Sequence, residues 1–570
     1  MASLLNRTAA STPFYAPQRW LFWGELCLIA RPLLSVAVAV MPLLCSRHVL
    51  ADNFWIGQPG ATAEWQTATN WLTPLLPLQN ENVTIGNGGI AQISSGIGYA
   101  QNLYLGDAGL TGFLRIEGGE LSLSGDFQTG IFIGSGAGST GGIVQTSGTV
   151  VAQNSAVRVL SIGTGTDSVA TYVHTGGSLE VQSLRVGSPS GPGAASNVTG
   201  TYTLGGTGTL TGGVTTIGQD GSSGSFVMTG GSASLFEVYI RSGGSLDISG
   251  GTFSTTTRSL NVDGTGSVSL SGGTLSTSSS VLTGSIAGSF TQTGGTHNSA
   301  PINVSGSYDL SSGSLVVGGT AGLALSGNFT LEGSATLSTT KLTQTAGLFD
   351  HVASTHETGI LAVNGGTYRM AAGSLSIASS WTLGSGGTFD FADGSGTVNV
   401  AASAAVNLSQ GTILNAGSAT VNVLGSETLV ILPTGFDPQT NFGSFNNQGT
   451  TYTIGSTLEV LADRTLRLSG AFADPVVVAG TLEASAGASL TLENGLTLQS
   501  GGSVSLGSAG AVRYAAGTYA ITGGSLTTRD LQIATSGTTN FTHSNGTAQA
   551  TNLSIGTGTD SVATYVHTGG

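Results

Sequence analysis

The sequence predicts an all-β protein built as a parallel β-solenoid, in which short strands stack in successive turns. Three observations point to this fold: an exact internal duplication, a short strand-and-turn motif that recurs along most of the chain, and a composition that favours strands and turns. The eighteen residues from Leu160 to Gly177 return unchanged at positions 553–570. Such self-similarity indicates a repeat architecture.

The composition excludes several classes of protein. Of 570 residues, 92 are Gly and only 8% are charged, whereas an average domain is about a quarter charged. Glycine without a strict three-residue period excludes collagen, and a hydrophobic content of 39% argues against disorder. The formal net charge of −14 makes nucleic acid and anionic membrane surfaces poor partners.

The first segment, residues 1–51, is of a different kind. Arg7, Arg19 and Arg31 precede an apolar run at 33–44, and small residues follow near position 51. This order predicts a secretory signal peptide and therefore export. A membrane anchor is the alternative, but the run is shorter than the ~20 residues that a spanning helix needs. Cys27 and Cys45 both lie in this segment, so the mature chain would have no disulfide, thiolate metal site or cysteine nucleophile.

The segment 52–100 is predicted to cap the solenoid. Trp55, Trp65 and Trp71 lie close together in it, and the first turn of a solenoid must cover an apolar end and unpaired strand edges. An aromatic site on which sugars stack is the functional alternative.

The segment 101–374 holds the main repeats. The principal motif is an apolar residue, any residue, an apolar or long polar residue, and then a Ser/Thr-Gly turn; further short strands precede and follow it. Copies of the principal motif lie at 114–119, 143–148, 172–177, 202–206, 226–231, 246–251, 268–273, 290–295, 308–313, 342–347, 361–366, 519–524 and 541–546. Copies of the preceding strand lie at 103–106, 131–134, 160–163, 184–187 and 214–218, and copies of the following strand at 120–123 and 178–181. We expect turns of about 20–30 residues.

These short strands favour a solenoid over an antiparallel fold. Each alternates apolar and polar residues, as a strand with one buried face does, and is too small to fold alone. Stacked in parallel at about 4.8 Å, they would form roughly 20 turns. An antiparallel sandwich or barrel array is the alternative, but its Asn-Gly hairpin signal is sparse. Asn-Gly pairs begin at Asn87, Asn364, Asn494 and Asn545.

The remaining chain divides into two further segments. From 375 to 515 the Gly-Gly motif thins, and residues 428–438 interrupt it, so we expect a degenerate solenoid region there, with a boundary between two stretches of solenoid as one interpretation. Regular repeats resume at 516–570. The second copy of the duplication stops within a repeat, and we expect the natural protein to continue.

The opening of the array resembles a known group of proteins. Trp65, Asn70-Trp71, Pro77 and the run from Asn82 to Gly89 are similar to the start of large exported repeat proteins of Gram-negative bacteria, and the alternation of 200–206 with 224–231 is similar too. These proteins carry autotransporter-associated β-strand repeats or end in PEP-CTERM sorting signals. The resemblance covers most of 52–570 and implies a surface or secreted solenoid. The chain departs from the group in showing neither a C-terminal barrel nor a sorting motif.

The charged residues do not form an evident catalytic set. Solenoid lyases and hydrolases gather carboxylates and a basic residue on neighbouring turns. The densest acidic groups here are Asp107, Glu117, Glu120 and Asp126, and the pair Asp390 and Asp393. The basic residues of the main array are Arg115, Arg158, Arg185, Arg241, Arg258, Lys341 and Arg369. We interpret the carboxylates as solvated turn residues and assign no catalytic residue.

The histidines are interpreted as packing residues. His174, His543 and His567 share one column of the repeat, where other turns carry Met228, Ile248, Leu270 and Gln292. A position that accepts such residues is expected to be half-buried and not a metal ligand or general base. His297, His351 and His356 show no ligand spacing, so we predict no metal and no cofactor.

The sequence therefore predicts a non-enzymatic, exported cell-surface or secreted β-solenoid that acts as a stalk, adhesin or autotransporter-like passenger. Surface glycans or matrix components are the expected partners, and the solenoid itself is not expected to enter a membrane. A carbohydrate-active β-helix enzyme, either a polysaccharide lyase or a hydrolase, is the alternative.

Overall fold

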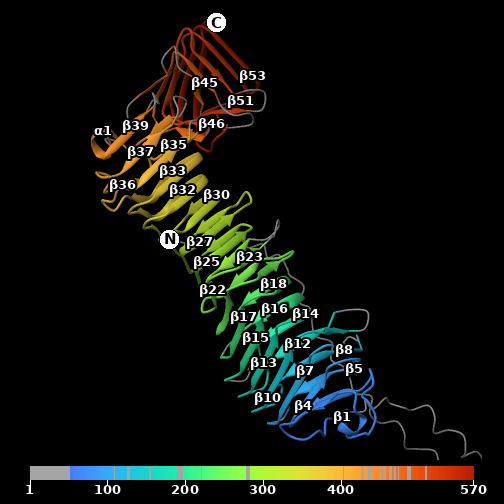
Figure 1. Ribbon diagram of the computed structural model, residues 1–570. Coiled ribbons are helices and arrows are strands. Elements are labelled where there is room, and N and C mark those ends of the chain that lie inside the picture. Colours follow the sequence, from blue (N-terminus) through green and yellow to red (C-terminus); the bar gives the residue numbers. More distant parts are fainter. Residues whose placement is uncertain are drawn as a thin grey trace, which may run out of the picture. The chain divides into compact units, whose positions relative to one another are not determined.

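The computed structural model describes residues 52–107, 109–124, 129–152, 156–188, 197–219, 221–277, 283–401, 404–424, 429–433, 436, 438–447, 452–453, 457–460, 462, 465–467, 470–472, 474–483, 489–506 and 510–570. The predicted signal peptide at 1–51 lies outside these residues, as does Asp126. The fold prediction is confirmed: the described chain is a parallel β-solenoid of about 19 turns (Figure 1).

The chain passes in each turn through three ladders of parallel strands. The first ladder contains β2 (Thr62–Glu64), β4 (Asn87–Ile93), β7 (Thr111–Ile116), β10 (Thr140–Gln145), β13 (Val169–His174), β15 (Thr199–Leu204), β17 (Ser223–Met228), β19 (Gly244–Ile248), β22 (Ser267–Leu270), β29 (Asn328–Leu331), β31 (Leu348–His351) and β36 (Thr412–Leu414). The second ladder contains β5 (Ile97–Ala100), β8 (Glu120–Leu123), β11 (Thr149–Ala152), β20 (Thr252–Thr255), β23 (Thr274–Thr277), β34 (Thr397–Val400), β37 (Thr420–Val423) and β39 (Ser444–Asn447). The third ladder contains β1 (Asp52–Phe54), β3 (Asn82–Ile85), β6 (Leu103–Leu105), β9 (Gly130–Ile133), β12 (Val159–Ile162), β21 (Leu260–Val262), β24 (Gly284–Ile286), β26 (Ile302–Val304), β28 (Leu323–Leu325), β35 (Ala405–Asn407), β38 (Leu429–Ile431) and β40 (Tyr452–Thr453).

Several longer strands bend at a corner and serve two or three ladders. They are β14 (Ser178–Val186), β16 (Thr209–Ile217), β18 (Ser232–Ile240), β25 (Ser289–Ser299), β27 (Ser307–Val317), β30 (Thr336–Gln344), β32 (Thr355–Met370) and β33 (Ser374–Asp390). A short 3-10 helix, η1 (Ala68–Asn70), and one helical turn, α1 (Pro438–Asn441), lie between strands.

The strands after residue 457 form separate sheets with the same parallel pairing. One sheet contains β41 (Leu458–Val460), β44 (Val476–Val478), β47 (Gly495–Leu498), β50 (Gly517–Ile521), β52 (Thr538–His543) and β54 (Val562–His567). The other contains β42 (Thr465–Arg467), β45 (Thr481–Glu483), β48 (Ser503–Ser505), β43 (Gly470–Phe472), β46 (Ser489–Leu492), β49 (Ala511–Tyr514), β51 (Ser525–Ile533) and β53 (Thr547–Ile555). A second hydrophobic core accompanies these sheets, and the change occurs within the region 375–515.

The corners require glycine at fixed places. Gly148 closes the corner after β10 with a φ of 73°, a conformation that residues with a Cβ rarely adopt. A Cβ at this position would also lie 2.2 Å from the carbonyl oxygen of Gly119 in the previous turn. The Ser/Thr-Gly motif is therefore a corner that backbone stacking imposes.

The core is a column of buried side chains inside the ladders, and a stack of aromatic rings dominates its middle. Adjacent rings in this stack are 4.4 to 4.9 Å apart with interplanar angles of 2° to 12°. The rings belong to Phe290, Tyr308, Phe329, Phe349, Tyr368 and Phe389, all fully buried. One ring per turn stacks well because the strand spacing of about 4.8 Å is close to a favourable ring separation.

The structure corrects two copies of the principal motif. Leu342-Thr343-Gln344 pairs with Leu323–Leu325, and both this strand and residues 361–363 belong to the third ladder, not to the first. The strand pattern followed by a Ser/Thr-Gly corner occurs on both ladders, so local sequence does not distinguish them. The first ladder in these turns instead contains Leu348–His351, which places His351 in the column of His174.

Candidate functional site

The three tryptophans of the first turns are core residues. Trp55, Trp65 and Trp71 are each at most 2% exposed. Trp71 packs edge-to-face against the other two, with ring centroids 5.0 and 4.8 Å away, and its Nε1 donates to the carbonyl oxygen of Trp65 at 2.8 Å. These rings therefore offer no exposed surface on which a sugar could stack.

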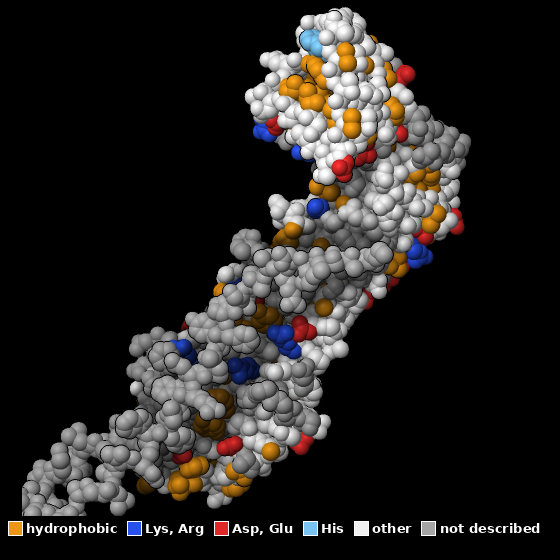
Figure 2. Space-filling model, turned by 180° about the vertical axis from the view of Figure 1, so that it is seen from behind, with side chains coloured by type: hydrophobic (Ala, Val, Ile, Leu, Met, Phe, Trp, Pro, Cys, Tyr) orange, Lys and Arg blue, Asp and Glu red, His pale blue; other side chains and the backbone are white. Residues whose placement is uncertain are grey.

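The acidic residues singled out in the sequence lie in separate local contacts. Arg115 approaches Glu117 at 3.6 Å, and the Asp107 carboxylate accepts a hydrogen bond from the Ser135 hydroxyl at 3.5 Å. Asp390 accepts hydrogen bonds of 2.8 Å from its neighbouring backbone and from Asn415. Figure 2 shows few charged side chains on the face it displays, and some of them lie in contact with a side chain of opposite charge.

The histidines of the first ladder make a specific buried contact. His174 is fully buried; its Nε2 lies 3.2 Å from the carbonyl oxygen of Gly177 and its Nδ1 lies 2.8 Å from the Tyr202 hydroxyl in the next turn. Because a carbonyl oxygen only accepts, Nε2 carries the proton and Nδ1 accepts from Tyr202. Burial lowers the pKa of His174, so this imidazole is neutral. The expectation of a half-buried position is wrong here.

Glutamine makes the same contact. Gln145 donates from Nε2 to the carbonyl oxygens of Gly148 and Ser178, and its Oε1 accepts from the Tyr172 hydroxyl at 2.7 Å. We call this arrangement, a Gln or His of one turn bound to a Tyr of the next, the tyrosine clasp. Along this column of the first ladder and its equivalent after residue 457, the clasps pair Gln145 with Tyr172, His174 with Tyr202, Gln292 with Tyr308, His351 with Tyr368 and His543 with Tyr565. The hydroxyls of Tyr308 and Tyr368 are also bound by His297 and His356 of the second ladder, at 3.0 and 2.9 Å.

Residues at the clasp positions vary together. Where the column carries an apolar residue, the next turn carries Phe in several cases: Phe226 follows Leu204, Phe290 follows Leu270 and Phe329 follows Leu310. The histidines are therefore not freely interchangeable with Met, Ile and Leu, as the sequence column suggested. Comparing each turn with the next, in place of comparing all turns at one position, reveals this pairing.

A surface cluster on the third ladder was not predicted. The Tyr239 hydroxyl donates to Glu237 at 2.7 Å, and the guanidinium of Arg241 lies over the Tyr239 ring while it pairs with Asp263 at 2.7 Å. The hydrogen bond to Glu237 raises the pKa of Tyr239. Glu237 and Tyr239 alternate along β18 and Arg241 follows its last residue, while the register that pairs β18 with β21 adds Asp263.

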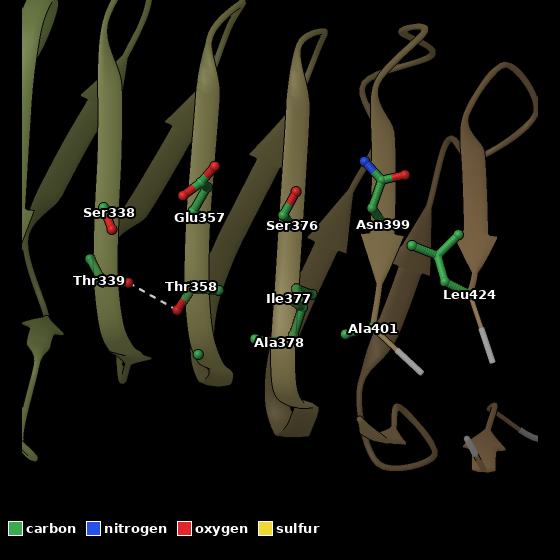
Figure 3. Close-up of a pocket in the computed structure, with 11 residues that line it drawn as sticks. Ser338, Thr339, Glu357, Thr358, Ser376, Ile377, Ala378, Asn399, Ala401 and Leu424 are labelled. Atoms are coloured by element: carbon green, nitrogen blue, oxygen red, sulfur yellow. Dashed lines mark hydrogen bonds between the residues drawn. The ribbon is translucent and has the colours of Figure 1, made fainter. Parts of the chain in front are cut away.

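The main array also carries a groove of about 360 Å³ along the edge of the second ladder (Figure 3). Ser338, Glu357, Ser376 and Asn399 are register partners on successive strands and form a polar row along it. Ala378, Ala401 and the half-exposed Leu424 line the groove as well. A polar row beside apolar side chains suits an extended ligand that lies along the ladder.

The groove is suited to hydrogen bonding. The row offers two hydroxyls, one amide and one carboxylate, and it continues as an amide ladder in which Asn422 donates to Asn399 at 2.8 Å and Asn446 donates to Asn422 at 2.6 Å. Glu357 is the one carboxylate among the described lining residues, whereas glycoside hydrolysis uses a pair. The groove residues therefore offer several hydrogen-bonding groups to a polyhydroxylated chain.

The described residues hold no group of three or more His, Cys, Asp or Glu placed to bind a metal ion. Within the same residues, no helix is long and apolar enough to cross a membrane. Comparison of the sequence with models of known protein families gives no match, and comparison with curated proteins gives none.

Proposed function

We propose that this chain is the β-solenoid of an exported, non-enzymatic protein of a bacterial surface or matrix, and that it acts as a stalk or adhesin-like passenger. The observation that carries the proposal is the polar row of the groove, which sits on a continuous ladder and repeats at the strand spacing. Such a row can hydrogen-bond successive units of one extended chain.

Two further features support the proposal. The apolar run at 33–44 and the small residues before Asp52 are typical of an export signal. The surface is rich in Ser, Thr, Asn and Gly and poor in charge, which favours hydration and hydroxyl recognition over ionic partners. Surface glycans or matrix polysaccharides are the ligand class that matches these groups.

Export is tested by expressing the full chain in a Gram-negative bacterium and fractionating the cells. We expect the chain outside the cytoplasm, shortened near residue 51, and we expect a variant that lacks 33–44 to remain in the cytoplasm. Retention of the unmodified full chain in the cytoplasm would contradict export.

Binding and catalysis are separated in one experiment with the purified full chain and a panel of polysaccharides. We expect at least one polysaccharide to be retained without any increase in reducing ends or unsaturated products, and we expect Ser376→Tyr, which fills the groove, to weaken retention. Ser269→Tyr, an outward substitution on β22, is the matched control. Accumulation of reducing ends or unsaturated products in proportion to the concentration of the purified chain would refute the non-enzymatic proposal.

A further inference from the structure

The outward column of the third ladder begins with an interrupted series of aromatic side chains. Phe54, Thr84, Tyr104 and Phe132 are register partners on β1, β3, β6 and β9. Tyr104 and Phe132 stack directly, with ring centroids 5.1 Å apart and an interplanar angle of 15°. Thr84 is the one small residue in this series of four, and it lies between two aromatic residues.

The small side chain leaves a space of defined width. Neighbouring strands are about 4.8 Å apart, so Phe54 and Tyr104 lie about 9.6 Å apart along the ladder, which leaves room for one flat ring between them. A hollow of about 520 Å³ occupies this place, lined by Phe54, Thr84, Tyr104 and Gly86 among others. A Cβ at Gly86 would lie 3.1 Å from Leu110, another lining residue. The volume falls in the range of small-molecule sites and far exceeds that of a single ion.

Polar groups surround the hollow. Asp52, Asn82, Asn87 and Asp107 line it. Asn82 donates to Asp52 at 3.0 Å and Asn87 donates to the carbonyl oxygen of Gly57 at 2.7 Å, and these contacts fix their side chains. Burial, with the charges of Asp52 and Asp107, raises the pKa of Tyr104, which keeps its hydroxyl a donor. Trp55 also lines the hollow, and among the described residues its buried Nε1 has no hydrogen-bond partner.

We propose that this hollow binds one pyranose unit of a surface glycan, with the sugar ring between Phe54 and Tyr104 and its hydroxyls bonded to the surrounding carboxylates and amides. Flat aromatic faces contact the C–H face of a sugar, and the mixture of donors and acceptors matches hydroxyl groups, which are both. An organic cation would use the rings and the carboxylates but not the amide donors. The site gives the proposed adhesin role a ligand class, and in that respect it rests on the proposed function.

The proposal is tested by saturation-transfer NMR on the purified full chain. The probes are methyl glycosides of glucose, galactose, mannose and N-acetylglucosamine, with choline as the cationic probe. We expect transfer to the ring C–H protons of at least one glycoside and none to choline. Transfer to choline alone, or to no glycoside, would overturn the proposal.

Substitutions locate the binding. Thr84→Tyr completes the aromatic series at an outward position whose neighbours in the ladder, Phe54 and Tyr104, are already aromatic, so we expect the fold to persist. The affinity for the glycoside should fall by more than about tenfold, because the new side chain fills the space for the sugar ring. Tyr104→Ala should weaken binding about three- to tenfold, the range that one aromatic contact supplies. Thr216→Tyr places the same side chain on the same column of β16, away from the hollow, and should bind as the unchanged protein does. Unchanged binding in Thr84→Tyr would refute the site.

The outcomes distinguish this site from the proposed function. Cytoplasmic retention of the chain with normal glycoside binding would refute export and leave the site. Normal export, with polysaccharide retention that depends on Ser376 and not on Thr84, would refute the site and leave the adhesin role.

Discussion

The tyrosine clasp predicts how the solenoid responds to substitution of His174. His174→Leu removes the acceptor of the buried Tyr202 hydroxyl and the donor to Gly177. An unpaired buried polar group costs about 1–3 kcal/mol, so we expect this loss in the local stability of β13 and β15. His174→Gln should stay within about 1 kcal/mol, because Gln145 already makes both contacts in the adjacent turn.

A double substitution separates the clasp from simple loss of volume. His174→Leu with Tyr202→Phe recreates the pair found at Leu204 and Phe226. We expect the double variant to be more stable than His174→Leu alone by about 1–3 kcal/mol, because no buried hydroxyl remains unpaired.

Amide hydrogen exchange read by mass spectrometry is the appropriate assay for this local change, since a repeat array can open turn by turn. Peptides from β13 and β15 should exchange about tenfold faster for each 1.4 kcal/mol lost, while peptides from β29 should not change. A double variant that exchanges as fast as the sum of the two single effects would refute the clasp as a coupled pair.

Three further predictions follow from the core. Burial lowers the pKa of His297 to about 3, below its value of about 6.5 in the unfolded chain. The unfolded chain therefore binds the proton more readily. The stabilisation is fully present above about pH 6.5, and the free energy of unfolding falls by about 1.4 kcal/mol for each pH unit between there and pH 3. The thermal midpoint should drop between about pH 7.5 and pH 5, and a constant midpoint would contradict this. Phe329→Ala opens a cavity in the ring stack and should cost about 3–5 kcal/mol in exchange measurements on β29. Phe329→Leu should be much milder, because Leu refills most of the lost volume; equal effects of the two substitutions would contradict cavity formation as the main cost. Deletion of 293–310 places Gln292 beneath Phe329, whereas deletion of 311–331 keeps every clasp. The variant that lacks 293–310 should therefore have the lower midpoint of thermal unfolding. Equal midpoints of the two variants would contradict the pairing of Gln or His with Tyr in the next turn.

The sequence predicts the strands and corners of each turn well, but it predicts less well which strands stack in the same ladder. The copies at 114–119, 143–148 and 172–177 are register partners in the structure, because strand alternation and glycine corners are local properties that each turn displays. Residues 342–347 were placed in the wrong ladder, because a corner has the same local chemistry wherever it occurs. Which ladder a strand joins depends on the number of residues between corners, and that number varies.

The candidate sites depend still more on register. Thr84 lies far from Phe54 and Tyr104 in the chain, and no local motif marks it as a gap; only the pairing of β1, β3 and β6 aligns the three side chains. The groove row is similar, since Ser338, Glu357 and Asn399 are ordinary polar residues until stacking places them on one line. The tryptophans were conspicuous in the sequence for the opposite reason: large aromatic residues are rare here, and the first turns use them as core.

The clasps also bear on how similar turns avoid pairing in the wrong order. Backbone pairing alone does not distinguish one turn from its neighbour, because most turns present the same ladder of amides and carbonyls. A slip that skipped one turn would place Gln292 beneath Phe329 and leave its Oε1 unpaired in the core, at a cost of about 1–3 kcal/mol. It would also separate the Tyr308 hydroxyl, which contacts His297 as well, from Gln292. Clasps at intervals between apolar pairs thus penalise a slipped register, while the apolar turns between them supply most of the burial. The matched deletions of one turn measure that penalty, because both shorten the array and only one breaks a clasp.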